Sequence, residues 1–488
     1  MLFNSYIFIL VFLPLCLAGY FLLNRLKFFT LAQCFLLGMS LWFYGYFNWG
    51  YLRIMIASIL INYLTYLAIR YFQNVGKMRM KKLVFIAGEL INVGILIYFK
   101  YMDFFIRTFN RIADTNLPLL EIVLPLGISF FTFQQISFVV DAYRGEAPDY
   151  NLLEYACFVS FFSQLIAGPI VTHDELVPQF RDMSKKHIIW ENLSRGIYIF
   201  VLGLSKKVLL ADVFGQAANF GFENVSRLDA TNAILTMLAY TLQIYFDFSG
   251  YCDMAIGTGK MLNIDIPLNF NSPYKALIIT EFWDRWHMTL TRFFTKYVYI
   301  PLGGNRKGEL RTYLNVFIVF FISGFWHGAG FAFIFWGVCH GLFSIITRKY
   351  RRFFKQMHPA LNWIITFGFV NVMWVFFRAS SLRTAVRLLN RIAIFRFGPI
   401  NGTVLSYFKL PEIEFILSRL PQIERIYPYF TLMIFFAFAL YIVLGYKNTY
   451  EKMQAFKPSV LNLSLTAFLA VWCIFSFTGE STFLYFNF

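Results

Sequence analysis

Long apolar runs separated by short basic segments dominate this chain of 488 residues. A helix that crosses a membrane needs about 20 consecutive, mostly apolar residues. Runs of suitable length and composition lie at 5–23, 30–48, 51–71, 82–100, 120–140, 193–211, 230–249, 311–326, 329–347, 361–377, 427–445 and 459–477. The pattern therefore predicts an all-α polytopic membrane protein with about 11 transmembrane helices.

Three further segments carry apolar residues in a different way. The stretches 152–170 and 251–263 are interrupted by glycine or proline, and we expect them to be re-entrant, because backbone can leave the helical form at membrane depth only where protein or a cavity satisfies it. Between 382 and 393, apolar and basic residues alternate at helical spacing, which predicts an amphipathic helix lying on the membrane surface. No internal repeat divides the chain, so we predict one membrane domain over 1–488.

The composition supports a membrane protein. Hydrophobic residues make up 58% of the chain and charged residues only 14%, whereas soluble domains carry about 25% charged residues. The net charge of +17 comes mostly from clusters that flank the apolar runs, which favours anionic lipids, and not nucleic acid, as the partner. If the loops after the first and third runs are cytoplasmic, the positive-inside rule places both the N-terminus and the C-terminus outside.

The six histidines fall into two groups. His173, His187 and His358 lie in polar, charge-rich segments and are expected on the surface. His327 ends an apolar run, and an ionisable residue at membrane depth indicates a functional site, although a histidine hydrogen-bonded between packed helices fits the same pattern. His340 lies thirteen residues further on, and a structural role suits it as well as a functional one.

The segment 282–293 reads as one interfacial helix. In that helix Asp284, His287 and Thr291 share a face by their spacing, either as a polar wall of a cavity or as a solvated stripe. A neutral imidazole is a suitable general base for removing a proton from a hydroxyl group. The sequence has no HExxH pattern and no Cys/His cluster, so we expect no metal site.

Several motifs together carry a family resemblance. They are FWDRWH at 282–287, YIPLGGNR at 299–306, GFWHG at 324–328, PLGISFFTFQQISFVVDAYRG at 125–145, FFSQLIAGPIV at 161–171, YFDFSGYCDMAIG at 245–257 and PLNFNSPY at 267–274. With these motifs the chain resembles the membrane-bound O-acyltransferase (MBOAT) family, in particular the bacterial branch of alginate and peptidoglycan O-acetyltransferase membrane subunits. The resemblance extends over the whole chain and is densest over 121–345.

The resemblance implies a ring of helices around a narrow centre through which an acyl group passes. It implies that His327 is essential and that His287 lines the same chamber. The residues it suggests for substrate binding are Trp283, Asp284, Trp286, Asn305, Trp326 and His340. No bound cofactor is expected; the donor would be acetyl-CoA or another acyl thioester, used from the cytoplasmic side of the bacterial inner membrane.

The resemblance also implies partners outside the membrane. The acceptor would be a cell-surface polysaccharide such as alginate or peptidoglycan, reached through a periplasmic or extracellular acetyltransferase of the SGNH type. The C-terminal tail, 479–488, ends in Phe483-x-Tyr485-x-x-Phe488. This ending resembles that of a small partner protein in teichoic acid D-alanylation, whose tyrosine is proposed to carry the acyl group. Tyr485 is thus a candidate acyl relay, and the alternative is a hydrophobic tail anchored at the interface.

Two other classes of function also fit parts of the pattern. A transporter or flippase for a cell-envelope precursor would also use membrane-embedded histidines and broken helices. A scaffold for an export complex would leave His327 without a role. We therefore expect a membrane acyltransferase, with a polytopic transporter as the alternative.

Overall fold

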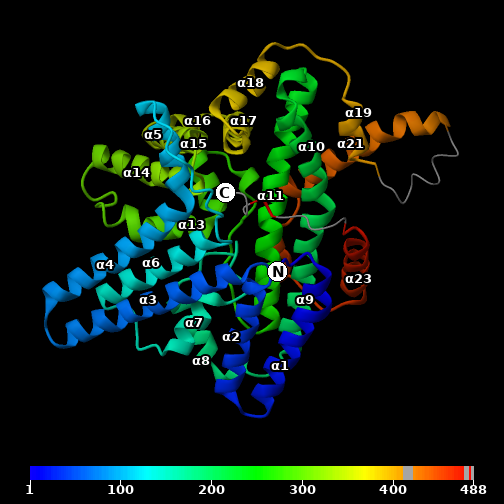
Figure 1. Cartoon of the computed structure of the whole chain (residues 1–488). Helices are drawn as coiled ribbons and strands as arrows, with labels where there is room; N and C mark the ends of the chain where they lie inside the picture. The colour runs from blue at the N-terminus through cyan, green and yellow to red at the C-terminus, as the bar shows by residue number, and fades with distance from the viewer. Residues whose placement is uncertain (410–420, 478–482, 485–488) are drawn as a thin grey trace.

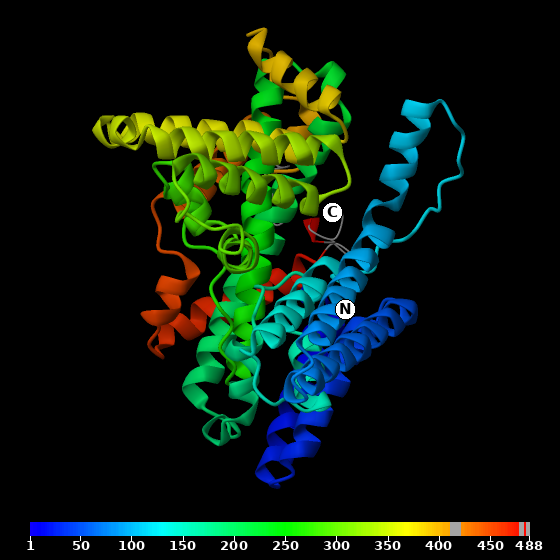
Figure 2. The ribbon, with the colours of Figure 1, turned by 90° about the vertical axis from the view of Figure 1, so that its left-hand side faces the viewer.

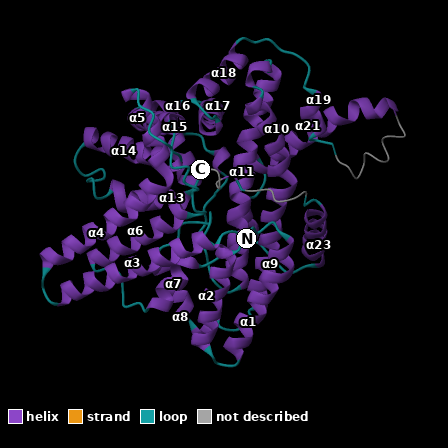
Figure 3. Cartoon of the chain, viewed as in Figure 1, coloured by secondary structure: helices purple, strands orange, loops and turns teal. Residues whose placement is uncertain are grey.

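The computed structural model describes residues 1–409, 421–477 and 483–484. Within these residues the chain forms helices and no β-strand, and the nearest approach to a sheet is an isolated antiparallel bridge between Phe270 and Trp286. The helices are joined by turns and by several longer loops, among them 114–127 and 161–172 (Figure 3). The predicted all-helical fold class is confirmed.

The α-helices follow one another in the order α1 (Leu13–Arg25), α2 (Phe29–Gly45), α3 (Trp49–Asn74), α4 (Met78–Leu96), α5 (Met102–Ala113), α6 (Ile128–Arg144), α7 (Leu152–Ser160), α8 (His173–Arg181), α9 (Trp190–Ser205), α10 (Asp212–Glu223), α11 (Ala230–Met261), α12 (Ile279–Arg285), α13 (Met288–Phe294), α14 (Glu309–His327), α15 (Phe331–Lys349), α16 (Arg351–Gln356), α17 (Pro359–Arg378), α18 (Leu382–Ala393), α19 (Gly402–Ser406), α21 (Pro421–Leu444), α22 (Thr449–Gln454) and α23 (Val460–Phe475). Wider π-helical turns are η1 (Phe8–Phe12), η2 (Ile97–Tyr101), η4 (Lys206–Ala211) and η7 (Thr295–Tyr299), and 3₁₀ turns are η3 (Met183–Lys185), η5 (Val225–Arg227) and η6 (Pro273–Lys275).

Six helical stretches in the described residues are long and apolar enough to cross a membrane. They are Phe8–Arg25, Trp49–Asn74, Met78–Ala113, Phe331–Lys349, Pro359–Arg378 and Ile426–Leu444. Two apolar helices, α2 and α23, are slightly shorter. The chain is thus a membrane protein, while the count of about 11 spans stays a prediction.

The long helix α11 forms the axis of the molecule, and α9 packs along it (Figure 1). We expected 251–263 to be re-entrant, and this was wrong, because α11 continues without a break to Met261. Its glycines serve close packing instead of chain reversal. A Cβ atom at Gly257 would lie 2.7 Å from the backbone nitrogen of Phe200 on α9. In the other stretch, 152–170, the chain does leave the helical form after Ser160.

Buried ion pairs join α11 to the helix beside it. The turn η4 presents two consecutive lysines, and Lys206 reaches Asp253 at 2.6 Å while Lys207 reaches Asp247 at 2.7 Å. Lys207 also lies 2.8 Å from Asp212. A charge inside a low-dielectric interior is tolerated only when it is paired and hydrogen-bonded, so these contacts hold η4 and α11 in register.

One histidine expected on the surface is buried. His173, at the start of α8, lies 3.2 Å from a carboxylate oxygen of Asp141 and 3.1 Å from the hydroxyl of Tyr150. The carboxylate of Asp141 also accepts bonds from Lys296 and Tyr297. The partners come from segments distant in sequence, and for this reason the local polarity around His173 gave the wrong expectation.

Two further features frame the site. The amphipathic helix predicted between 382 and 393 forms as α18; it buries Ala385 and Leu388 and packs against α11 and α17. The antiparallel pair α14 and α15 lies across α11, not along it (Figure 2). This crossing brings the end of α14, which carries His327, toward the axis.

The close contact at Gly257 generates a stability prediction. We expect Gly257→Ala to lower the melting temperature of the protein in detergent, because the new methyl group would collide with α9 backbone. Gly368→Ala in α17 is the matched control, because a Cβ there meets nothing within 4 Å and alanine favours the helix. Differential scanning fluorimetry compares the two; an unchanged or raised melting temperature for Gly257→Ala would contradict the packing described here.

Candidate active site

His327 is the last residue of α14 and is buried. The helix stops because Gly328 is extended, and α15 begins three residues later at Phe331. The imidazole lies against two indole rings, with ring centroids 4.8 Å from Trp326 and 5.2 Å from Trp336. A membrane-embedded histidine is thus enclosed by aromatic walls at a helix end.

The hairpin of α14 and α15 is held together by backbone contact. A Cβ atom at Gly324 would lie 2.5 Å from the carbonyl oxygen of Phe333, and one at Gly337 would lie 2.4 Å from that of Phe320. Only glycine permits this approach. It sets His340 of α15 against α14, with its ring 6.2 Å from that of Phe320.

His287 does not lie within a helix, which corrects the expectation of one continuous helix over 282–293. The chain forms α12 and α13, with His287 between them in the left-handed region at φ +47°. Asn269 stabilises the break: its backbone carbonyl accepts from Met288 N–H, and its side-chain oxygen accepts from the N–H and hydroxyl of Thr289. Tertiary hydrogen bonds therefore override the helical periodicity.

The three histidines form one buried group, which we call the histidine cluster: His287, His327 and His340 with Trp326 and Trp336 between them. The ring of Trp326 lies 6.4 Å from His287 and 4.8 Å from His327. Trp336 joins His327 to His340 in the same way. The structure thus brings together His327 and His340, which the sequence placed at membrane depth, and His287, which it placed on an interfacial helix.

Neighbouring groups fix opposite tautomers of two of these rings. The Nδ1 atom of His287 lies 3.1 Å from the side-chain oxygen of Asn269, and an amide oxygen only accepts, so Nδ1 carries the hydrogen and Nε2 carries the lone pair. The Nε1–H of Trp283 donates to Nδ1 of His340 at 3.2 Å, so His340 carries its hydrogen on Nε2. His287 is therefore suited to accept a proton and His340 to donate a hydrogen bond.

A lysine that the sequence analysis did not single out supports the end of α14. Lys100 Nζ donates to the carbonyl of Trp326 at 2.5 Å, and the hydroxyl of Tyr101 donates to that of Phe325 at 2.6 Å. The last carbonyls of a helix have no partner in the helix itself, and a cation there also complements the helix dipole. The sequence did contain a signal for this residue, because a lysine inside an apolar run such as 82–100 is rare and indicates a functional role.

Of the other predicted site residues, some are buried near the histidine cluster and others are exposed. Trp283 and Trp286 are buried, and Trp283 contacts His340 directly. Asp284 and Asn305 are exposed and do not join the histidine cluster. Tyr485 lies outside the described residues. The catalytic and substrate-binding roles of these residues stay predictions.

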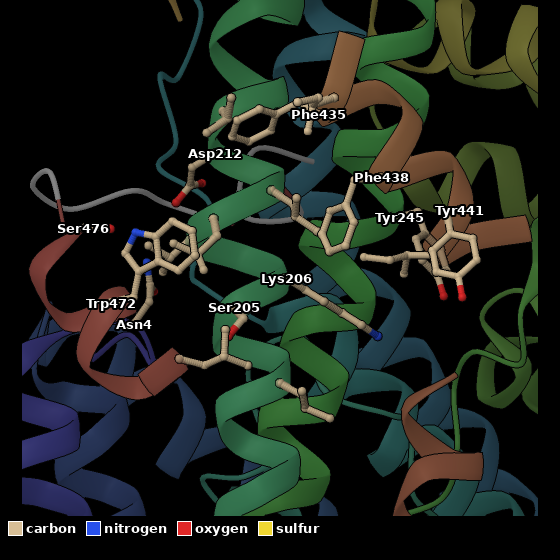
Figure 4. A pocket seen from close by; sticks show the side chains of 18 of the residues that line it. Asn4, Ser205, Lys206, Asp212, Tyr245, Phe435, Phe438, Tyr441, Trp472 and Ser476 are labelled. Carbon is tan, nitrogen blue, oxygen red and sulfur yellow. The ribbon is translucent and has the colours of Figure 1, made fainter. Parts of the chain in front are cut away.

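A separate cavity of about 1100 Å³ lies between α9 and η4 on one side and α21 and α23 on the other. Its walls are mostly apolar, including Phe438 and Trp472, with Lys206 toward its inner side (Figure 4). None of the three clustered histidines lines it. Tyr245, which does, lies 6.4 Å from the ring of Trp286, so a layer of aromatic rings separates the cavity from the cluster.

The chain was compared with known proteins. Residues 123–384 match the model of the MBOAT, membrane-bound O-acyltransferase, family. A peptidoglycan O-acetyltransferase of Helicobacter pylori is 40% identical, covering 100% of this chain and 98% of the relative. A probable alginate O-acetylase of Pseudomonas aeruginosa is 38% identical, covering 85% and 78%, and a teichoic acid D-alanyltransferase of Bacillus subtilis is 26% identical, covering 50% and 66%.

The cap on α14 generates a prediction. We expect Lys100→Met to lower the rate of acyl transfer at least about tenfold, because a carbonyl beside His327 loses its donor and the ring loses its fixed position. Lys82→Met on α4 is the control, since Lys82 is exposed and should tolerate the change. Rates are compared in proteoliposomes at matched protein levels; a wild-type rate for Lys100→Met would exclude the positioning role.

Proposed function

Because the chain belongs to the membrane-bound O-acyltransferase family, we propose that it passes an acetyl or other acyl group across the membrane for O-acylation of a cell-surface polysaccharide such as peptidoglycan or alginate. The observation that carries the proposal is the histidine cluster, in which His287, a ring with its hydrogen on Nδ1, lies near two other histidines. A transporter without chemistry would leave both the family and this arrangement without explanation.

Peptidoglycan is supported by the relative from Helicobacter pylori, which matches over the full chain, and alginate by the relative from Pseudomonas aeruginosa. The donor is acetyl-CoA or another acyl thioester on the cytoplasmic side. The acceptor side holds a periplasmic or extracellular acetyltransferase partner of the SGNH type, and both chain termini face it. The basic loops support this orientation in a bacterial inner membrane and favour contact with anionic lipids.

In the proposed reaction a hydroxyl oxygen attacks the carbonyl carbon of the thioester. His287 Nε2 takes the hydroxyl proton, which its tautomer allows. The C–S bond then breaks, and the proton passes to the leaving thiolate. His327 orients the donor between Trp326 and Trp336, and the N–H of His340, whose ring also contacts Trp336, stabilises the developing negative charge.

The first acceptor is the phenol of Tyr485. Its acetyl ester is a more activated donor than an alkyl ester, because a phenolate with a pKa near 10 leaves more readily than an alkoxide. In the second step a hydroxyl of the outside partner attacks this ester, and the phenolate recovers a proton. Splitting the transfer in this way replaces one difficult step by two easier ones.

For His327 we expect substitution by alanine to lower transfer roughly 10²-fold while membrane insertion is retained, because the donor loses its positioning group. His187→Ala is the control, since His187 is exposed. The measurement is transfer of labelled acetyl from acetyl-CoA in proteoliposomes and O-acetylation of polysaccharide in cells. Full acetylation by a well-expressed His327→Ala protein would contradict the role of His327 in orienting the donor.

For Tyr485 the decisive substitution is phenylalanine, which keeps the ring and deletes the nucleophile. We expect Tyr485→Phe to abolish acetylation of the polysaccharide and to remove acetyl label from the chain itself, as followed by mass spectrometry of the C-terminal peptide. Tyr441→Phe on α21 is the control, because Tyr441 lies in the separate cavity. Unchanged acetylation by Tyr485→Phe would show that the tail serves only as an anchor.

A further inference from the structure

The C-terminal tail returns to the core of the molecule at Phe483 and Leu484, and both residues are buried. The backbone N–H of Leu484 donates to a carboxylate oxygen of Asp247 at 2.9 Å. The ring of Phe483 lies 4.6 Å from that of Tyr251, edge to face, and the ammonium of Lys207 lies 4.7 Å from its centroid. Three different side chains of η4 and α11 thus contact two consecutive tail residues.

The contacts use a buried group of charges in which one lysine faces two carboxylates. One oxygen of Asp247 accepts from Lys207 at 2.7 Å, and the other accepts from Leu484. Lys207 keeps a second carboxylate, Asp212, at 2.8 Å. A hydrogen bond to a buried charged group contributes more to stability than one between neutral groups. The N–H of Leu484 therefore supplies a hydrogen bond that a buried oxygen of Asp247 accepts.

The contacts of Phe483 and Leu484 lie close to the histidine cluster. Phe248, the residue after Asp247 on α11, has its ring 4.9 Å from that of His287. The other side of the same region is closed by the N-terminus, since Phe3 stacks on Tyr251 at 4.9 Å. The two ends of the chain thus meet on Tyr251, one helical turn from the residue that contacts His287.

We propose that acyl transfer requires the chain's own C-terminal tail to be docked on Asp247, Lys207 and Tyr251, which hold Phe483 and Leu484 near the histidine cluster. Asp247 and Lys207 are positioning residues in this scheme. The purpose of the dock rests on the proposed relay, whereas its existence does not.

The test separates the hydrogen bond from the ion pair. Leu484→Pro removes the N–H donor and leaves Asp247 and Lys207 unchanged, and Leu484→Ala keeps the donor as its control. Asp247→Asn removes the carboxylate while Lys207 keeps Asp212, and Asp114→Asn is its control, because Asp114 is exposed at the end of α5. Each full-length variant is reconstituted in nanodiscs.

Two readouts are measured on each variant: trimming of the tail by carboxypeptidase, followed by intact mass, and acetyl transfer from acetyl-CoA. We expect Leu484→Pro and Asp247→Asn to speed trimming about tenfold or more and to lower transfer, with both controls near wild type. Trimming that is equally slow in Leu484→Pro and wild type would overturn the dock.

The proposed function fails in a different way. Fast trimming together with full transfer, or full transfer by Tyr485→Phe, would overturn the relay while supporting the dock as a structural contact. Loss of transfer in Leu484→Pro with the tail still protected would overturn the positioning role of these residues.

Discussion

A polar group inside a membrane-embedded protein has to find its partner within the protein, because lipid offers none. In this chain that constraint is met by pairing groups on helices that are distant in sequence. Lys207 of η4 meets Asp247 of α11, and Lys100 of η2 meets the open carbonyls at the end of α14. Without the first contact, a charge would be left unpaired in a low-dielectric interior. Without the second, the carbonyl of Trp326 at the end of α14 would lose its donor.

The same constraint determines how the histidine cluster is held. Asn269 supports the break at His287 and also fixes which of its nitrogens bears the hydrogen. Trp283 fixes the opposite tautomer of His340. The aromatic rings between these histidines exclude water, and in such surroundings electrostatic interactions are stronger than in solvent. Fixed tautomers and an enclosed site are what acyl transfer between a thioester and a hydroxyl needs.

The sequence was sufficient for the features that depend on local composition. Most of the apolar runs became helices because run length and hydrophobicity act locally, although the run 120–140 is helical only from Ile128. His327 was conspicuous because an ionisable side chain is rare in such a run. Features set by distant contacts were missed. The break at His287 depends on Asn269, and the burial of His173 on Asp141, a residue of another helix. No periodicity in either segment reports those partners.

Carrying the tail on the same chain changes the kinetics of a two-step transfer. Where a relay group resides on a separate subunit, its supply depends on the abundance of that subunit and on its dissociation constant. A tail seated at Asp247 through Leu484 is instead present at a fixed effective concentration, which chain connectivity sets in the millimolar range for short tethers. In the proposed two-step transfer, flux through the first step would then follow the number of enzyme molecules and the supply of the acyl donor alone.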